Sequence, residues 1–145
     1  MHRGDTENHR EEKEGGVADD RAALNELTRR VIGAAIEVHR HLGPGLLESA
    51  YETRLAYELQ QAGLAFERQR ALPLIHKEIH LEQGYRIDLL VEEKVVAELK
   101  TAEQLTPVHT AQLLSYLKLC GCDVGWLPNV NVKLLQNGIR RLVMN

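Results

Sequence analysis

The chain has 145 residues, of which 43% are hydrophobic and 27% charged, and a formal net charge of −3. This composition is typical of one globular domain. We expect no membrane-spanning segment, because no apolar run is long enough, and no signal peptide, because the chain lacks a charged-then-apolar start. The two cysteines, Cys120 and Cys122, are too close in sequence for a useful disulfide, so a reducing cytoplasm is the expected location.

Residues 1–20 form an acidic segment with three basic and seven acidic side chains. The segment has few apolar residues and is interrupted by Gly15 and Gly16. Such a segment cannot bury enough apolar surface to offset its ordering entropy, so we predict a disordered charged tail at 1–20. A single domain is expected at 21–145. Its formal charge of +1 does not indicate a strongly basic surface for nucleic acid.

The first helix is predicted to begin after Asn25, a favourable N-cap, and to end near Leu42. Its apolar stripe contains Leu27, Val31, Ala35 and Val38. His39 and His41 are two residues apart, so they point to different sides of a helix and are expected at the surface. Gly43-Pro44-Gly45 ends the helix.

A second helix is predicted from Gly45 to about Ala62. Glu48 falls in its first turn, where the helix dipole favours a carboxylate. Tyr51 is expected to pack between the two helices rather than to take part in chemistry.

Extended strands are predicted next. Phe66 to Ile79 reads as one or two strands, and the apolar runs Ile87–Val91 and Val95–Leu99 read as a hairpin around Glu92 and Glu93. Neither run of the hairpin alternates cleanly between apolar and polar residues. Both faces of the sheet are therefore expected to be covered.

Asp88, Glu98 and Lys100 lie inside these apolar runs. A buried charge is costly unless it is paired or bound to a metal, so the three residues indicate a site. Glu98 and Lys100 share one face of their strand, because side chains alternate along it. If Asp88 lies beside Glu98, the two carboxylates can hold a hard divalent cation, with the carbonyl of Leu99 as a further ligand. Lys100 could then orient or help deprotonate a metal-activated water, or stabilise charge on a phosphoryl oxygen.

The register of the hairpin decides whether this site exists. A two-residue turn at Glu92 and Glu93 pairs Asp88 with Ala97 and sends Asp88 and Glu98 to opposite faces. A three-residue connection, or one bulge, brings Asp88 opposite Glu98. The sequence leaves both registers open.

Thr106-Pro107 predicts the start of a third helix that ends near Cys120. Gln112 on this helix could face solvent. Two further strands are expected at Asp123–Leu127 and Gly138–Val143. The order of elements predicts an α/β fold with a mixed central sheet and helices on both sides.

Asp88, followed ten residues later by Glu98-x-Lys100 on a hairpin, resembles the PD-(D/E)XK nuclease superfamily. The motif Gly45-x-x-Glu48-x-x-Tyr51 matches the one that names the GxxExxY family, small bacterial and archaeal proteins assigned to the same superfamily. The resemblance extends from about Leu27 to Val143 and includes the stretches 86–91, 96–100 and 106–118. Ile87 stands where the superfamily pattern has proline, a residue that supplies no ligand.

The resemblance implies a restriction-endonuclease-like core and a Mg²⁺-dependent phosphodiester hydrolase acting on DNA or RNA, with Mn²⁺ as a possible substitute. Asp88, Glu98 and the Leu99 carbonyl would hold the metal, and Glu48 would reach it directly or through water. Lys100 would assist the nucleophile and Gln112 would position it. A homodimer could enlarge the substrate-binding surface. The alternative is a non-catalytic module that keeps the nuclease fold and binds nucleic acid or protein.

Overall fold

A computed structural model gives the fold, and it describes the backbone of residues 6–76 and 79–144 and the side chains of 19–72 and 85–144. The helices are α1 (Thr6–Leu42), α2 (Glu48–Gln61) and α3 (Pro107–Cys120), with a 3₁₀ turn η1 (Leu135–Asn137). The strands are β1 (Phe66–His76), β2 (Ile79–Val91), β3 (Val95–Ala97), β4 (Val124–Pro128) and β5 (Ile139–Val143).

The five strands form one mixed sheet in the order β1-β2-β3-β4-β5. Neighbouring strands are antiparallel except β3 and β4, which are parallel. Parallel neighbours need a crossover, and α3 supplies it between β3 and β4. The predicted α/β class with a mixed central sheet and flanking helices is confirmed, and it is consistent with a restriction-endonuclease-like fold.

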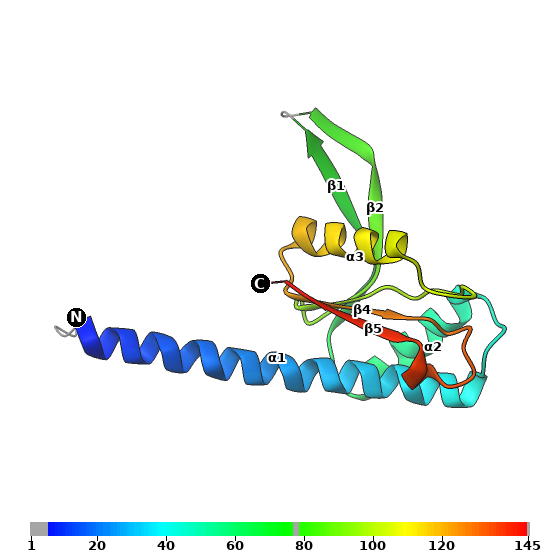
Figure 1. The fold of residues 1–145 in the computed structure, drawn as a ribbon, viewed down its shortest axis with the longest axis horizontal. Helices are drawn as coiled ribbons and strands as arrows, with labels where there is room; N and C mark the ends of the chain where they lie inside the picture. Colours follow the sequence, from blue (N-terminus) through cyan, green and yellow to red (C-terminus); the bar gives the residue numbers. More distant parts are fainter. Residues whose placement is uncertain (1–5, 77–78, 145) are drawn as a thin grey trace.

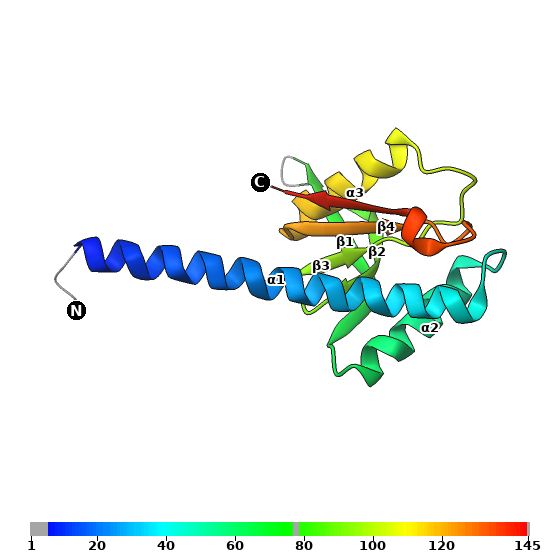
Figure 2. The same ribbon diagram turned by 60° about the horizontal axis from the view of Figure 1, so that its bottom comes forward.

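Helices cover both faces of the sheet, as Figures 1 and 2 show. On one face, α1 and α2 pack against the alternate residues Leu89, Val91, Val95, Ala97 and Leu99. On the other face, α3 packs against Leu90, Val96 and Leu127. The faces follow the period of two along each strand. Glu98 and Lys100, in phase with Val96, therefore belong to the α3 face.

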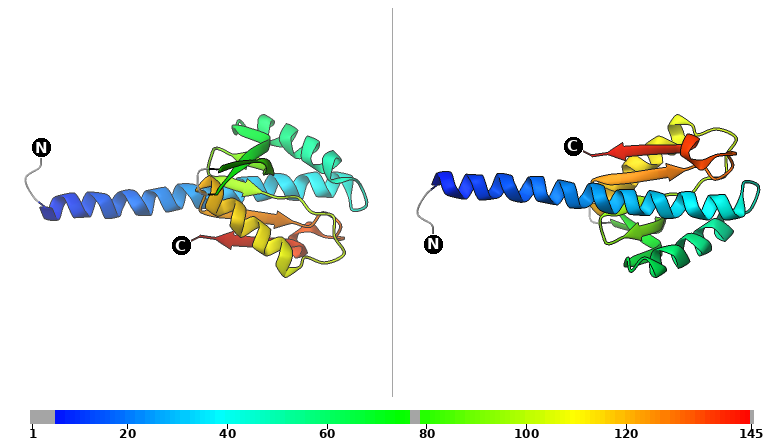
Figure 3. Two further views of the ribbon diagram at one scale, coloured as in Figure 1. Left: turned by 90° about the horizontal axis from the view of Figure 1, so that it is seen from above. Right: turned by 90° about the horizontal axis from the view of Figure 1, so that it is seen from below.

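The first helix is longer than the sequence predicted. It begins at Thr6 rather than after Asn25, and residues 6–20, which we expected to be a disordered tail, continue it. Glu, Lys, Arg and Ala favour helix, and adding residues to an existing helix is easier than starting one, so Gly15 and Gly16 do not end it. This part of α1 projects beyond the rest of the domain (Figures 1 and 3). Residues 1–5 lie outside the described residues.

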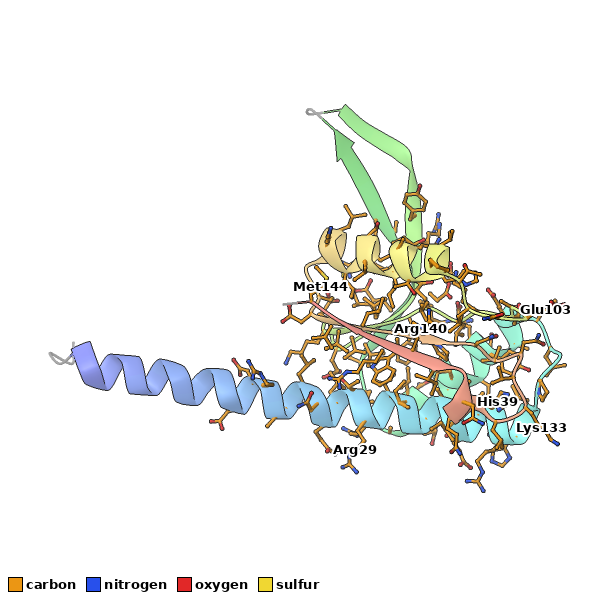
Figure 4. All side chains as sticks on the ribbon, viewed as in Figure 1. Arg29, His39, Glu103, Lys133, Arg140 and Met144 are labelled. Atoms are coloured by element: carbon orange, nitrogen blue, oxygen red, sulfur yellow. The ribbon has the colours of Figure 1, made fainter. Side chains whose placement is uncertain are left out.

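His39 is buried, so the prediction that it lies at the surface is wrong. Only 4% of the residue is exposed, and its Nε2 lies 3.2 Å from the carbonyl of Val130. The ring stacks on Tyr51, with the ring centroids 6.4 Å apart. Figure 4 shows His39 near the C-terminal end of α1. His41 is exposed, as predicted.

The third helix begins and ends as predicted. Thr106 is its N-cap and forms a capping box with His109, and Pro107 is the first helical residue. Gly121 follows the last turn with φ 75°, a left-handed conformation that glycine adopts without steric cost. Cys120, at the end of α3, is a free thiol. The helix is therefore fixed at both ends, which fixes the side chains that it presents to the sheet.

Candidate active site

A tight connection joins β2 to β3. The amide of Lys94 donates to the carbonyl of Val91 at 3.0 Å, and Glu92 and Glu93 between them have φ of 53° and 58°. Such values are uncommon for residues other than glycine. Ala65 supports the turn, because its carbonyl accepts from the Glu92 amide at 2.8 Å and its amide donates to the Glu92 carboxylate at 2.5 Å.

The connection is three residues long, which settles the register that the sequence left open. Val91 pairs with Val95 and Leu89 with Ala97. One step further along the two strands, Asp88 lies opposite Glu98. The structure therefore has the register that places both carboxylates on one face.

The backbone hydrogen bonds between β2 and β3 end at this step, and beyond it the two carboxylates, instead of backbone carbonyls, accept from the amides of the opposite strand. The Asp88 amide donates to Oε1 of Glu98 at 2.9 Å, and the Leu99 amide donates to Oδ2 of Asp88 at 2.9 Å. Each side chain is thus held by the backbone of the opposite strand. On the other side, the amides of Glu98 and Lys100 donate to carbonyls of the β4 chain segment at 2.9 and 3.0 Å.

The Glu98 carboxyl is almost fully buried, with 3% of the residue exposed. Burial and, next, the charge of Asp88 raise its pKa to about 9, although the Asp88 amide and Lys100 act in the opposite direction. At neutral pH the metal-free carboxyl therefore holds a proton. Carboxylates are hard oxygen donors, which Mg²⁺ and Mn²⁺ prefer, so the side chains of Asp88 and Glu98 suit such an ion.

Lys100 and Gln112 meet on the same face of the sheet. Nζ of Lys100 donates to Oε1 of Gln112 at 2.9 Å, and both residues are half-buried. Gln112 therefore does not simply face solvent. The charge of Lys100 also acts on Glu98, which joins this pair to the two carboxylates.

Glu48 lies at the edge of the site. Its Oε1 accepts from the amide of Thr101, the residue after Lys100, at 3.1 Å. Among the described residues, no three His, Cys, Asp or Glu side chains are close enough to hold one ion. The structure thus does not bring Glu48 together with Asp88 and Glu98 into one ligand cluster.

Tyr51 packs between the helices as predicted and also orders the loop before Glu48. The residue is 1% exposed, and its hydroxyl donates to the carbonyl of Gly43 and accepts from the amide of Leu46 at 3.3 Å. Gly43 and Gly45 have φ of 69° and 97°, so this loop uses conformations that favour glycine. Tyr51 thereby fixes the approach to the first turn of α2.

Tyr116 belongs to the site, although the sequence reasoning did not select it. It lies one turn after Gln112 on α3 and is 4% exposed. Burial and, next, the charges of Glu98 and Asp88 raise its pKa to about 12. The spacing of four residues from Gln112 is the signal that could have identified it.

Gln69 and Glu52 are further neighbours that the sequence reasoning missed. Nε2 of Gln69, on β1, lies 3.2 Å from Oδ1 of Asp88 and 2.6 Å from Oε1 of Glu52 on α2. No local motif connects these three residues, because their contact depends on the pairing of β1 with β2 and on the packing of α2.

A search of the described residues found no helix that is both long and apolar enough to cross a membrane. Comparison with curated proteins and with solved structures gave no match to the chain. Comparison with protein-family models matched residues 25–142 to a model described as the PD-(D/E)XK nuclease superfamily. This range contains all six candidate site residues, Glu48, Asp88, Glu98, Leu99, Lys100 and Gln112. The chain therefore belongs to the PD-(D/E)XK nuclease superfamily.

Proposed function

We propose that the protein is a Mg²⁺-dependent nuclease that hydrolyses phosphodiester bonds in nucleic acid and also accepts Mn²⁺. Within the superfamily, we assign it to the GxxExxY family on the motif from Gly45 to Tyr51. The observation that carries the activity is a pair of cross-strand hydrogen bonds, from the Asp88 amide to the Glu98 carboxyl and from the Leu99 amide to the Asp88 carboxylate, with both carboxyl groups on the face that carries Lys100.

Asp88, Glu98 and the carbonyl of Leu99 would hold the cation, with Glu48 acting through a water molecule. The Leu99 amide donates to Asp88, and in an extended strand the N–H and C=O of one residue point to the same side, which supports Leu99 as a ligand. When bound, the cation would lower the pKa of a water molecule and stabilise charge on the phosphoryl oxygens.

The protein's own groups would control the rest of the reaction. A water oxygen would form a bond to phosphorus while the ester P–O bond breaks, and the proton that the water loses would pass through solvent to the leaving oxygen. Lys100, as an ammonium that donates to Gln112, is suited to orient the water or to stabilise the developing charge. Gln112 restricts the position of Nζ. Tyr116 is buried close enough for the charges of Glu98 and Asp88 to raise its pKa, and it would help to exclude water from this side of the carboxylates.

The test is incubation of the full chain with single- and double-stranded DNA and RNA, in Mn²⁺, Mg²⁺ or EDTA, with cleavage scored on gels. Asp88→Asn and Lys100→Met should abolish cleavage. Glu26→Gln is the matched control, because Glu26 is an exposed partner of Arg29 on the opposite side of the sheet. This variant should cleave nucleic acid like the wild type.

Metal binding without cleavage of any substrate would instead favour the non-catalytic module, which isothermal titration of the wild type and Asp88→Ala with Mn²⁺ would detect. The cleavage assay also distinguishes a DNA substrate from an RNA substrate. Sedimentation analysis would test the proposed homodimer. A reducing cytoplasm is the proposed location, because Cys120 and Cys122 are free thiols.

A further inference from the structure

Gln69 has an unusual backbone conformation next to the site. It lies in β1 between Arg68, which pairs with Leu89, and Arg70, which pairs with Ile87, so it stands opposite Asp88. Its φ is 52°, whereas strand residues normally have a negative φ. A strained conformation of this kind persists only where the surroundings enforce it, and such residues cluster at functional sites.

The side-chain amide of Gln69 connects two carboxylates. Nε2 donates to Oε1 of Glu52 at 2.6 Å and to Oδ1 of Asp88 at 3.2 Å. An amide nitrogen carries two protons, so it can serve both acceptors. Glu52 is 8% exposed and is held in turn by Nε of Arg68, 3.0 Å from Oε2. Gln69 is thus anchored on one side by a nearly buried, ion-paired carboxylate.

These contacts fix the orientation of Asp88. Its Oδ1 accepts from Gln69 and its Oδ2 from the Leu99 amide, so both oxygens are held. A carboxylate oxygen has two lone-pair sites, so each oxygen keeps one site for a further partner. The carboxylate is therefore oriented without being blocked.

We propose that Glu52 and Gln69 form a positioning relay that holds the Asp88 carboxylate in the orientation that binds a divalent cation. This inference rests on the proposed function, in which Asp88 is a metal ligand. Hydrogen-bond partners of metal-binding carboxylates orient the ligands, and their loss typically weakens metal affinity by about 10–100-fold. The ion pair between Glu52 and Arg68 would not by itself require Gln69 to adopt a positive φ.

The direct test is Gln69→Asn in the full chain. Asparagine tolerates the left-handed conformation and keeps the amide, but it is one methylene shorter and cannot reach both carboxylates. We expect the Kd for Mn²⁺, measured by isothermal titration, to rise by about 10–100-fold. The thermal midpoint of the metal-free protein should stay near that of the wild type. Gln60→Asn is the matched control, because Gln60 is exposed on α2 and should leave the Kd unchanged.

Glu52→Gln provides a second variant in case Gln69→Asn does not fold. It keeps the shape and an acceptor oxygen but removes the charge that attracts the Gln69 amide, so the Kd should rise by less than in Gln69→Asn. If Glu52 and Gln69 only stabilise the fold, both variants should lower the thermal midpoint of the metal-free protein and leave the Kd of the folded fraction unchanged.

The outcomes separate the relay from the function on which it rests. If Gln69→Asn folds and binds Mn²⁺ with the wild-type Kd, the relay is overturned and the proposed metal site stays intact. If Gln69→Asn does not fold, the same result for a folded Glu52→Gln overturns the relay. A wild-type protein that binds no Mn²⁺ overturns both. A weakened Kd in Gln69→Asn beside an unchanged Kd in Gln60→Asn supports the relay.

Discussion

Replacing Glu98 with Gln should stabilise the metal-free protein at neutral pH. The wild-type carboxyl is buried beside Asp88, and both features disfavour its charge. Glutamine has nearly the same shape and keeps an oxygen that can accept from the Asp88 amide. Its NH₂ group can also donate to the Asp88 carboxylate, as the proton on the wild-type carboxyl can.

The magnitude follows from the pKa of Glu98, which is about 9 in the folded chain and has its ordinary value of 4.5 in the unfolded chain. Between these values the folded chain keeps a proton that the unfolded chain releases. The free energy of unfolding therefore decreases as the pH rises through this window. By pH 7 the loss is about 3 kcal/mol, since one pKa unit corresponds to about 1.4 kcal/mol. Glu98→Gln does not titrate and should escape this loss.

The assay is urea unfolding in EDTA at pH 5, 6, 7 and 8. The difference in free energy of unfolding between Glu98→Gln and the wild type should be small at pH 5 and grow toward pH 8. Glu103→Gln is the control, because Glu103 is an exposed carboxylate on the loop after Lys100 (Figure 4) and should follow the wild-type profile. Millimolar Mn²⁺ should stabilise the wild type near pH 8 and not Glu98→Gln.

A different result would refute this reasoning. If Glu98→Gln is less stable than the wild type at every pH, Glu98 is ionised in the folded chain and forms a structural pair with Lys100. A difference that does not change with pH would likewise show that the carboxyl does not hold a proton. The first result would also favour a structural ion pair over metal binding as the role of Glu98.

Three other changes test separate parts of the structure. Leu99→Ala should lower the free energy of urea unfolding by about 2–5 kcal/mol, because the Leu99 side chain is 2% exposed in the core. The variant should still be stabilised by Mn²⁺, and loss of that response would mean that the cavity distorts the ligands. Deleting residues 1–20 should leave the thermal midpoint nearly unchanged, because the core begins at Leu24, and a decrease of many degrees would contradict this. Tyr116→Phe should leave the alkaline side of the pH–rate profile unchanged, because the hydroxyl, with a pKa of about 12, stays protonated; a lost alkaline limb would show that it titrates.

The sequence predicted the faces of the central strands well, because a period of two is a local property. Glu98 and Lys100 share a face with Val96, and that face packs on α3, as their spacing requires. The register could not be predicted. It depends on Glu92 and Glu93 adopting a positive φ, which glutamate rarely does, and Ala65, far away in sequence, supports that turn.

The two errors in α1 have different physical origins. The start after Asn25 rests on that residue as an N-cap before the apolar stripe, and the core does begin near there, at Leu24. Helix propensity nevertheless carries the backbone back to Thr6 without an apolar face. His39 was assigned to the surface because it lacks a histidine partner at the spacing of a metal pair. Its burial depends on Tyr51 and Val130, which come from other parts of the chain.

The charges around Asp88 explain why a cation suits this site. The Glu98 carboxyl is buried and Asp88 is half-buried, and the two receive mainly neutral donors, the amides of Asp88 and Leu99 and the side chain of Gln69. Among the described side chains, Lys100 is the positive charge that acts on Glu98, and it does not compensate for two ionised carboxylates. In the metal-free protein, a proton on Glu98 neutralises the negative charge that Lys100 leaves uncompensated. Because a divalent cation would supply that charge without a proton, metal binding should release a proton from Glu98 and become tighter as the pH rises toward 9.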